Sequence, residues 1–303
     1  MRILLFFLMC FICNSLVAQD SLSYSSTEII YGRKDGVALT MIKVTPTQNK
    51  NGKAIISLVS GNWNSNFSMA GRYIPRSIYL VKNGFTVFFV MHGSQPRFAI
   101  NDQVDDVKRA VRFIKHNATA YAIDADHIGI AGSSSGGHLS LMVALTNDKV
   151  KTNAVDPIDR LSSSVQAAAV FFPPTDFINW GAENTKIDVQ RLARLGVAGA
   201  FDFKILSDST GMYEHIKGDE NIKKIAAANS PIFQVSSDDP PVLIFHGDAD
   251  PVVPIQQSYS LIKQLNEKKV RNELIVRKGA GHGWRNDEAE EKKIIEWFEK
   301  FLK

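Results

Sequence analysis

The fold of this chain is decided by residues 128–139, which read Ile128-Gly129-Ile130-Ala131-Gly132-Ser133-Ser134-Ser135-Gly136-Gly137-His138-Leu139. A short apolar run leads into the pattern Gly-x-Ser-x-Gly, and a run of helical character follows it. A nucleophile elbow requires this order, because its serine sits on a tight turn between a strand and a helix. Three serines stand in a row, but only Ser134 has a glycine two residues away on each side. The pattern predicts Ser134 as a nucleophile, and the alternative is a serine- and glycine-rich loop that binds phosphate.

Two later segments carry residues suited to acid–base chemistry. Residues 241–254 are an apolar run followed by an acidic loop that contains Asp248 and Asp250. Residues 273–284 are a third strand-like run, and it leads to His282 between two glycines. Because the carboxyl ends of parallel strands meet at one edge of a sheet, we expect these side chains to meet Ser134 there.

The residue types match the needs of acyl transfer. A serine hydroxyl is a weak nucleophile at neutral pH and needs an adjacent base. We expect His282 to accept the proton of Ser134 and an aspartate to orient the imidazole. Asp248 and Asp250 share one loop, and their spacing alone does not choose between them.

These motifs resemble those of α/β-hydrolases in the esterase and prolyl-oligopeptidase-like group, with bacterial carboxylesterases closest in pattern. In such proteins His-Gly-x-x-Asp-x-x-Val-Pro carries the catalytic acid, and matching it onto residues 246–254 favours Asp250. Asp248 is then expected to hold the loop. The resemblance implies an α/β-hydrolase fold, with a mostly parallel central sheet, helices on both faces and a small helical insertion. It implies no cofactor.

The oxyanion hole is where the chain departs from this pattern. Relatives often carry His-Gly-Gly-Gly-Trp after an early strand, whereas this chain reads Leu58-Val59-Ser60-Gly61-Asn62-Trp63-Asn64. Backbone N–H groups form such a hole, so the changed side chains need not abolish it. The resemblance implies one donor at the N–H of Ser135 and a second at Asn62 or Trp63. An ordinary surface turn is the alternative interpretation.

Apolar runs and helical periodicity predict alternating strands and helices along the rest of the chain. The predicted strands are residues 37–45, 53–60, 85–91, 126–130 and 165–172, and the predicted helices are 74–83, 102–120, 255–268 and 287–302. This alternation is typical of a mostly parallel sheet covered by helices on both faces. Residues 176–235 break the pattern, with residues 188–203 predicted as helical. We interpret them as a cap-like insertion over the site, and the alternative is a peripheral excursion.

The first residues predict a secretory signal peptide. A charged start, an apolar stretch and small residues before Gln19 indicate cleavage after Ala18, which leaves residues 19–303 as the hydrolase domain. We therefore expect a secreted or periplasmic protein without stable membrane insertion of the mature chain, and an uncleaved anchor is the alternative. Both cysteines, Cys10 and Cys13, lie in this segment, so the mature chain would form no disulfide.

Composition argues against several other classes of function. The net charge is only +4, and the basic residues are interleaved with acids, which is not typical of a nucleic-acid site. No spacing of His, Cys, Asp or Glu predicts a metal site, and the glycine-rich turn lacks the lysine of a nucleotide-binding loop. His92, His138 and His246 are interpreted as structural, although His92 could also line the pocket.

The sequence thus predicts a secreted serine hydrolase that cleaves small-molecule or carbohydrate esters with short acyl groups, acetyl among them. One alternative is a serine peptidase of the prolyl-oligopeptidase type, because the same three residues serve amide hydrolysis. The other alternative is a binding protein that has kept the fold without the activity.

Overall fold

The computed structural model describes residues 23–146, 150, 152–181, 196–201, 204–206, 209–215 and 218–303. The predicted signal peptide, residues 1–18, lies outside these ranges. The strands are β1 (Tyr24–Lys34), β2 (Val37–Pro46), β3 (Ala54–Leu58), β4 (Thr86–Val90), β5 (Ile128–Ser133), β6 (Ala167–Phe171), β7 (Lys204–Leu206), β8 (Tyr213–His215), β9 (Val242–Gly247) and β10 (Asn272–Arg277). The α-helices are α1 (Phe67–Lys82), α2 (Ile100–His116), α3 (Ala118–Tyr121), α4 (Ser135–Leu145), α6 (Asp219–Ala228), α7 (Gln256–Glu267) and α8 (Glu288–Phe301).

Eight of these strands form one sheet in the order β1-β2-β4-β3-β5-β6-β9-β10. Strands β1 and β2 pair antiparallel with each other, and β2 pairs antiparallel with β4. Every pair from β4 to β10 is parallel. The prediction of a mostly parallel sheet is therefore confirmed.

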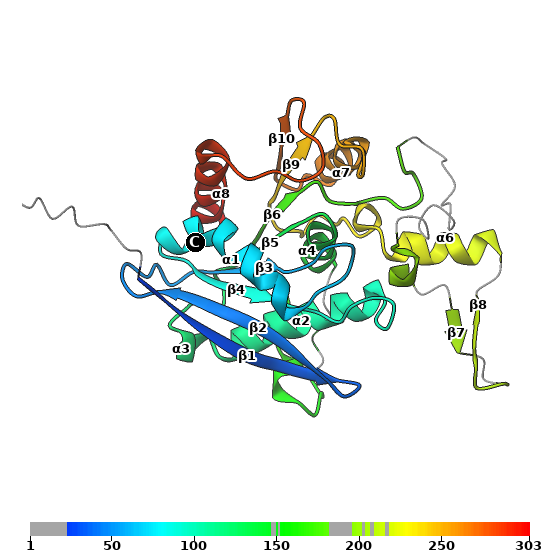
Figure 1. The fold of residues 1–303 in the computed structure, drawn as a ribbon, viewed down its shortest axis with the longest axis horizontal. Helices are drawn as coiled ribbons and strands as arrows, with labels where there is room; N and C mark the ends of the chain where they lie inside the picture. The colour runs from blue at the N-terminus through cyan, green and yellow to red at the C-terminus, as the bar shows by residue number, and fades with distance from the viewer. Residues whose placement is uncertain are drawn as a thin grey trace, which may run out of the picture.

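The sheet is covered by helices on both faces, as predicted (Figure 1). Helices α2, α4 and α7 pack on one face over a core that includes Ile56 and Phe88. Helices α1 and α8 pack on the other over a core that includes Ile55 and Phe89. Neighbouring residues of one strand enter opposite cores because side chains alternate across a strand. Burial on both faces explains why these central strands read as continuous apolar runs.

Two predicted helices have different limits in the structure. Helix α1 begins at Phe67 rather than at residue 74, because the side chain of Asn66 accepts the N–H of Met69 and caps the helix there. Pro75 lies inside α1, although it offers no N–H to the helix. The segment predicted as one helix over 102–120 is α2 followed by α3, and Asn117 between them leaves the helical conformation.

Strand β1 has no counterpart in the sequence prediction. Most of its side chains are exposed because it lies at the edge of the sheet and pairs with β2 alone. An edge strand of this kind lacks the apolar alternation that marks a half-buried strand.

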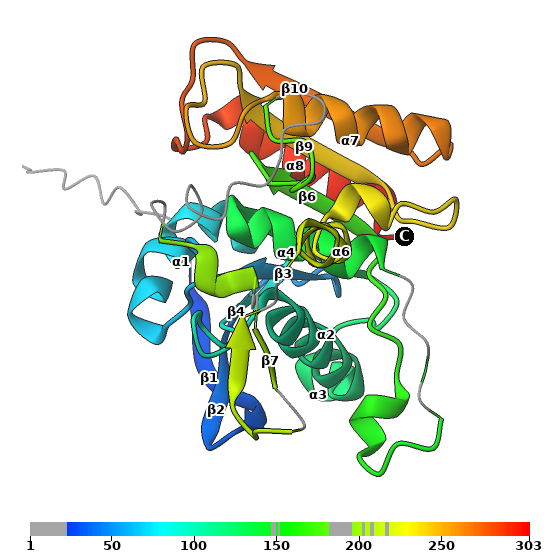
Figure 2. The ribbon, with the colours of Figure 1, turned by 90° about the vertical axis from the view of Figure 1, so that its right-hand side faces the viewer.

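The predicted insertion, residues 176–235, leaves the sheet between β6 and β9. Its described parts hold α6, the antiparallel pair β7–β8 and two short 3₁₀ helices, η2 (Ala198–Phe201) and η3 (Pro231–Phe233). In Figure 1, α6 and the pair β7–β8 stand apart from the central sheet, and Figure 2 views the molecule from that side, with α6 in front of α4. Most of the segment predicted as helical, residues 188–203, lies outside the described residues.

Candidate active site

Ser134 lies on the sharp turn that joins β5 to α4. Its backbone has φ 54° and ψ −123°, a conformation that non-glycine residues rarely adopt. The N–H of Ser134 donates to the carbonyl of Phe171 at 2.9 Å, which ties the turn to the end of β6. A Cβ atom on Gly132 would lie 2.4 Å from the backbone of Gly136, so the approach of strand and helix requires glycine at this position.

The structure brings Ser134, His282 and Asp250 together. The Nε2 atom of His282 lies 2.9 Å from the Oγ of Ser134, and its Nδ1 atom lies 2.8 Å from the Oδ2 of Asp250. The imidazole is 20% exposed, whereas the carboxylate of Asp250 is fully buried. This is the geometry in which a carboxylate orients an imidazole that takes a proton from a hydroxyl.

The surroundings of Asp250 favour its charged form. Burial acts to raise the pKa of this carboxyl, but hydrogen bonds to His246 and His282 and to the N–H groups of Val252 and Val253 hold the pKa well below its ordinary value. The carboxylate therefore stays ionised at neutral pH and can stabilise an imidazolium at His282.

Asp248 makes a different contact. Its Oδ1 accepts the backbone N–H of Gly279 at 2.5 Å, which links the loop after β9 to the loop after β10. The geometry thus pairs His282 with Asp250 and assigns Asp248 to holding the loop.

Phe172 packs against the imidazole of His282, a role that the sequence analysis missed. Their ring centroids are 4.6 Å apart in an edge-to-face arrangement, and Trp284 also packs against Phe172, with ring centroids 5.0 Å apart. Phe172 is buried and has a positive φ of 37°. Its position directly after β6, at the carboxyl edge of the sheet, was the one signal that the sequence offered.

The segment expected to complete the oxyanion hole is a tight turn, residues 61–64, which we call the oxyanion turn. Gly61 and Asn64 exchange two backbone hydrogen bonds of 2.9 Å across it. Asn62 and Trp63 at its tip both have left-handed backbones, with φ values of 51° and 55°. Each such non-glycine residue costs about 1–2 kcal/mol, so contacts with the rest of the protein must hold the turn in this form.

The expected donors are unpaired. Within the part of the chain that the structure describes, the backbone N–H groups of Asn62 and Trp63 donate to no other group. Ser135 is the first residue of α4, where a backbone N–H has no partner within the helix. The Oγ atoms of Ser60 and Ser135 lie 3.0 Å apart. The segment between β3 and the oxyanion turn therefore contacts the start of α4. The assignment of these N–H groups as oxyanion donors stays a prediction.

His246 and His138 are both fully buried and hydrogen-bonded. His246 contacts the Oγ of Ser258 at 2.6 Å and the carbonyl of Val253 at 2.9 Å. These contacts hold the acid loop, which is the loop after β9 that carries Asp248 and Asp250. His138 lies between Trp63 of the oxyanion turn and Asn229 of the insertion.

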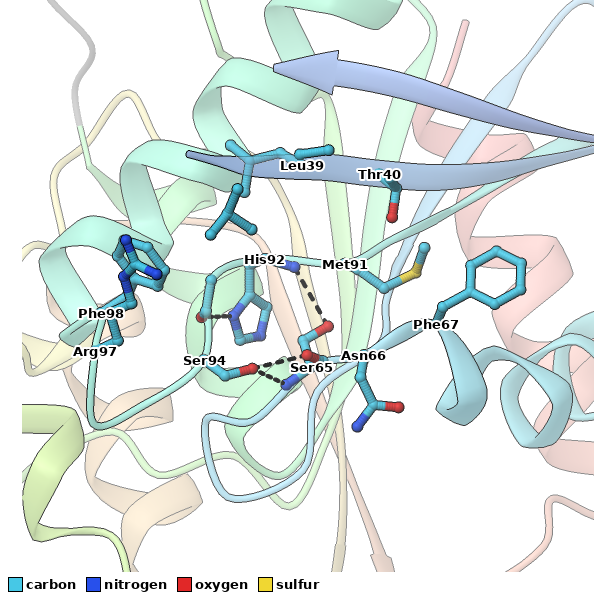
Figure 3. A pocket seen from close by; sticks show the side chains of 13 residues that line it. Leu39, Thr40, Ser65, Asn66, Phe67, Met91, His92, Ser94, Arg97 and Phe98 are labelled. Atoms are coloured by element: carbon cyan, nitrogen blue, oxygen red, sulfur yellow. Dashed lines mark hydrogen bonds between the residues drawn. The ribbon is translucent and has the colours of Figure 1, made fainter. Parts of the chain in front are cut away.

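His92 lines a cavity of about 380 Å³ between the start of β2, the loop after β4 and the start of α1 (Figure 3). The lining of this cavity includes none of Ser134, Asp250 and His282. Burial lowers the pKa of His92 to about 4, against a smaller opposing effect of its hydrogen bond to Gly93. His92 is therefore neutral near pH 7, and it lines a cavity separate from Ser134, Asp250 and His282.

Among the residues that the structure describes, no helix is both long and apolar enough to cross a bilayer. The same residues also hold no group of three or more His, Cys, Asp or Glu side chains arranged to bind a metal ion.

Comparison with known proteins places this chain in a family. The sequence model of the BD-FAE family matches residues 42–265. The probable carboxylic ester hydrolase LipM of Mycobacterium tuberculosis is 28% identical over 214 residues, which are 70% of this chain and 44% of LipM. The chain thus spans about half the length of the first curated relatives that it matches.

Solved structures share the fold. A truncated carbohydrate esterase from gut microbiota superimposes with a TM-score of 0.76 and 27% identity, covering 94% of this chain and 98% of that one. An esterase of Thermogutta terrifontis superimposes with a TM-score of 0.69 and 23% identity, covering 91% of this chain and 93% of that one. The fold is therefore that of the α/β-hydrolases, as the sequence predicted.

Proposed function

This chain belongs to the BD-FAE family of α/β-hydrolases, and we propose that it is a serine hydrolase that cleaves carboxylic esters. The observation that carries the proposal is the hydrogen-bonded row from Ser134 through His282 to Asp250. The similarity to LipM and to a carbohydrate esterase supports the same reaction.

In the proposed reaction the Oγ of Ser134 attacks the ester carbonyl while the Nε2 of His282 takes its proton. The resulting oxyanion is stabilised by the unpaired N–H groups of Ser135 and of the oxyanion turn. His282 then gives the proton to the leaving alcohol as the C–O bond breaks, and the acyl group stays on Ser134. Water, deprotonated by His282, attacks this acyl-enzyme, and the acid is released as Ser134 regains its proton.

The substrates that we propose are esters of short acyl groups, acetylated carbohydrate among them. The support is the resemblance to the carbohydrate esterase, which is matched over nearly its whole length. Release of acetate from acetylated xylan tests this class directly. Turnover of acetyl esters of simple phenols without release from the polysaccharide would restrict the substrate to small molecules.

The decisive experiment compares the wild type with Ser134→Ala on p-nitrophenyl acetate, butyrate and octanoate at pH 8. Loss of the nucleophile should lower kcat by several orders of magnitude, on the order of 10⁶-fold. Ser133→Ala is the matched control, because it removes a hydroxyl one residue away and should retain activity. A wild type that cleaves none of these esters but cleaves aminoacyl-p-nitroanilides would be a peptidase. Absence of both activities, and of labelling by a fluorophosphonate, would favour a binding protein.

We also propose that residues 1–18 direct export and are then removed. The support is the charged and apolar start of the chain with small residues before Gln19. Amino-terminal sequencing of the protein recovered from the periplasm or medium should begin at Gln19. Retention of the full chain in the membrane fraction would instead indicate an uncleaved anchor.

A further inference from the structure

His138 joins the oxyanion turn to the insertion through a buried chain of hydrogen bonds. The indole Nε1–H of Trp63 donates to the Nδ1 of His138 at 3.1 Å. The Nε2 of His138 lies 2.7 Å from the backbone carbonyl of Asn229, directly after α6. The imidazole is wholly buried, and Trp63 is nearly so.

The partners fix the tautomer of His138. A carbonyl oxygen can only accept, so the Nε2 of His138 must carry the proton, and Nδ1 then offers its lone pair to the indole N–H. Burial lowers the pKa of His138 to about 4, although the hydrogen bond to Asn229 acts to raise it. The imidazole is thus a neutral acceptor for Trp63 at any pH near neutrality.

The oxyanion turn depends on such support, because its two left-handed residues are not glycines. Two glutamines hold its carbonyls. The Nε2 of Gln103 donates to the Trp63 carbonyl at 3.1 Å, and the Nε2 of Gln95 donates to the Asn62 carbonyl at 2.8 Å. The Nε2 of Gln95 also lies 2.8 Å from the carbonyl of Gly196 in the insertion.

The rings of the insertion enclose Trp63 as well. Phe177 and Phe201 have ring centroids 5.9 and 5.8 Å from that of Trp63, and Phe177 also packs against His138 at 5.3 Å. Among these contacts, only the bond from Trp63 to His138 joins a side chain of the turn to the helix that begins after the nucleophile.

We infer that His138 is a positioning residue that holds the oxyanion turn through Trp63 and couples it to the insertion. The inference rests on the proposed function, since it assigns His138 to the catalytic machinery of that reaction. It gives the insertion a role in the proposed reaction, because the Asn229 carbonyl sets the tautomer on which the bond to Trp63 depends.

Three substitutions test the two hydrogen bonds of the imidazole separately. His138→Phe keeps an aromatic ring at this position and removes both hydrogen bonds. An asparagine amide lies close to the position of Nδ1, so His138→Asn can still accept from Trp63. A glutamine amide lies close to the position of Nε2, so His138→Gln keeps only the contact with Asn229. We expect His138→Phe and His138→Gln to lower kcat on p-nitrophenyl acetate by about tenfold to a hundredfold, below the loss of a whole oxyanion donor, with KM little changed. His138→Asn should recover most of the rate.

His92→Phe is the matched control. It also replaces a buried, neutral histidine at the same edge of the sheet, but its side chain bonds to Gly93 and to neither the turn nor α4. A purely structural role for His138 predicts similar losses of thermal stability and unchanged kcat in both variants, and that result would overturn the inference.

A double-substitution cycle tests the bond itself. Trp63→Phe removes the indole donor, and combined with His138→Phe it should lower kcat no further than either change alone. Fully multiplicative effects would also overturn the inference.

A readout without catalysis keeps this test apart from that of the proposed function. The indole N–H resonance of Trp63, assigned by its absence in Trp63→Phe, should shift in His138→Phe and His138→Gln and stay near its wild-type position in His138→Asn. Shifts of this pattern in a protein without esterase activity would refute the function and leave the bond established. An unmoved resonance in an active esterase would refute the role of His138 alone.

Discussion

The Nε2 of His282 lies 2.9 Å from the Oγ of Ser134, although 148 positions of the chain separate the two residues. They stand after β5 and β10, which are separated in the sheet by β6 and β9. The loop after β10 must therefore fold back along the carboxyl edge. Asp250 after β9 and Phe172 after β6 both contact the imidazole on that path. Each strand between nucleophile and base thus supplies one support for the base.

The acid loop offers a direct comparison of its two aspartates. Asp250→Asn should lower kcat on the order of 10⁴-fold, because an amide stabilises neither the correct tautomer nor the cation of His282. Asp248→Asn can still accept the N–H of Gly279, so it should lower kcat far less. Steady-state kinetics on p-nitrophenyl acetate measures both. A greater loss in Asp248→Asn would reverse the assignment.

Two glycine substitutions are predicted to change the stability of the protein in opposite directions. Gly132→Ala places a methyl group 2.4 Å from the backbone of Gly136 and should lower the free energy of unfolding by about 1–3 kcal/mol or more, together with activity. Gly71 lies inside α1, and no described atom lies within 4 Å of the Cβ that alanine would add. Gly71→Ala should therefore stabilise by about 0.5–1 kcal/mol. Urea unfolding measures both, and equal destabilisation would contradict the packing argument.

The two buried neutral histidines, His92 and His138, predict a loss of stability in acid. Each has a folded-state pKa of about 4, below its ordinary value of 6.5, so between these values the unfolded chain binds more protons than the folded one. The stabilisation is complete above pH 6.5 and is lost as the pH falls towards 4, by about 3 kcal/mol for each histidine. Urea unfolding at pH 7 and pH 4.5 should show a smaller change in His92→Phe and in His138→Phe than in the wild type. Identical changes in all three proteins would refute this account.

Phe172 is predicted to affect both stability and rate. Phe172→Ala leaves a cavity against His282 and should lower the free energy of unfolding by about 3–5 kcal/mol. It should also lower kcat, because the imidazole loses the ring that limits its motion. Phe85→Ala is the control, since Phe85 is fully buried against Phe298 just before β4, at the opposite edge of the sheet. If both variants lost stability and kept kcat when assayed well below their melting temperatures, Phe172 would be a packing residue only.

Much of the fold was predictable from local patterns. Apolar runs marked the central strands because those strands are buried on both faces. Ser134 could be named because a strained turn between strand and helix restricts the residues around it, and that restriction is local. Edge strand β1 and the start of α1 were missed or misplaced, because exposed side chains and a single capping bond from Asn66 leave little periodic signal.

The sequence by itself determined which residue types stand after which strands, and the order Ser134, Asp250, His282 was already sufficient to predict the chemistry. Only the tertiary structure decided which aspartate meets His282 and where Phe172 packs. It also decided that His138 joins Trp63 to Asn229, 91 positions further along the chain than the histidine itself. These relationships depend on distances between loops of different strands, and those distances are set by the twist and packing of the whole sheet rather than by neighbouring residues.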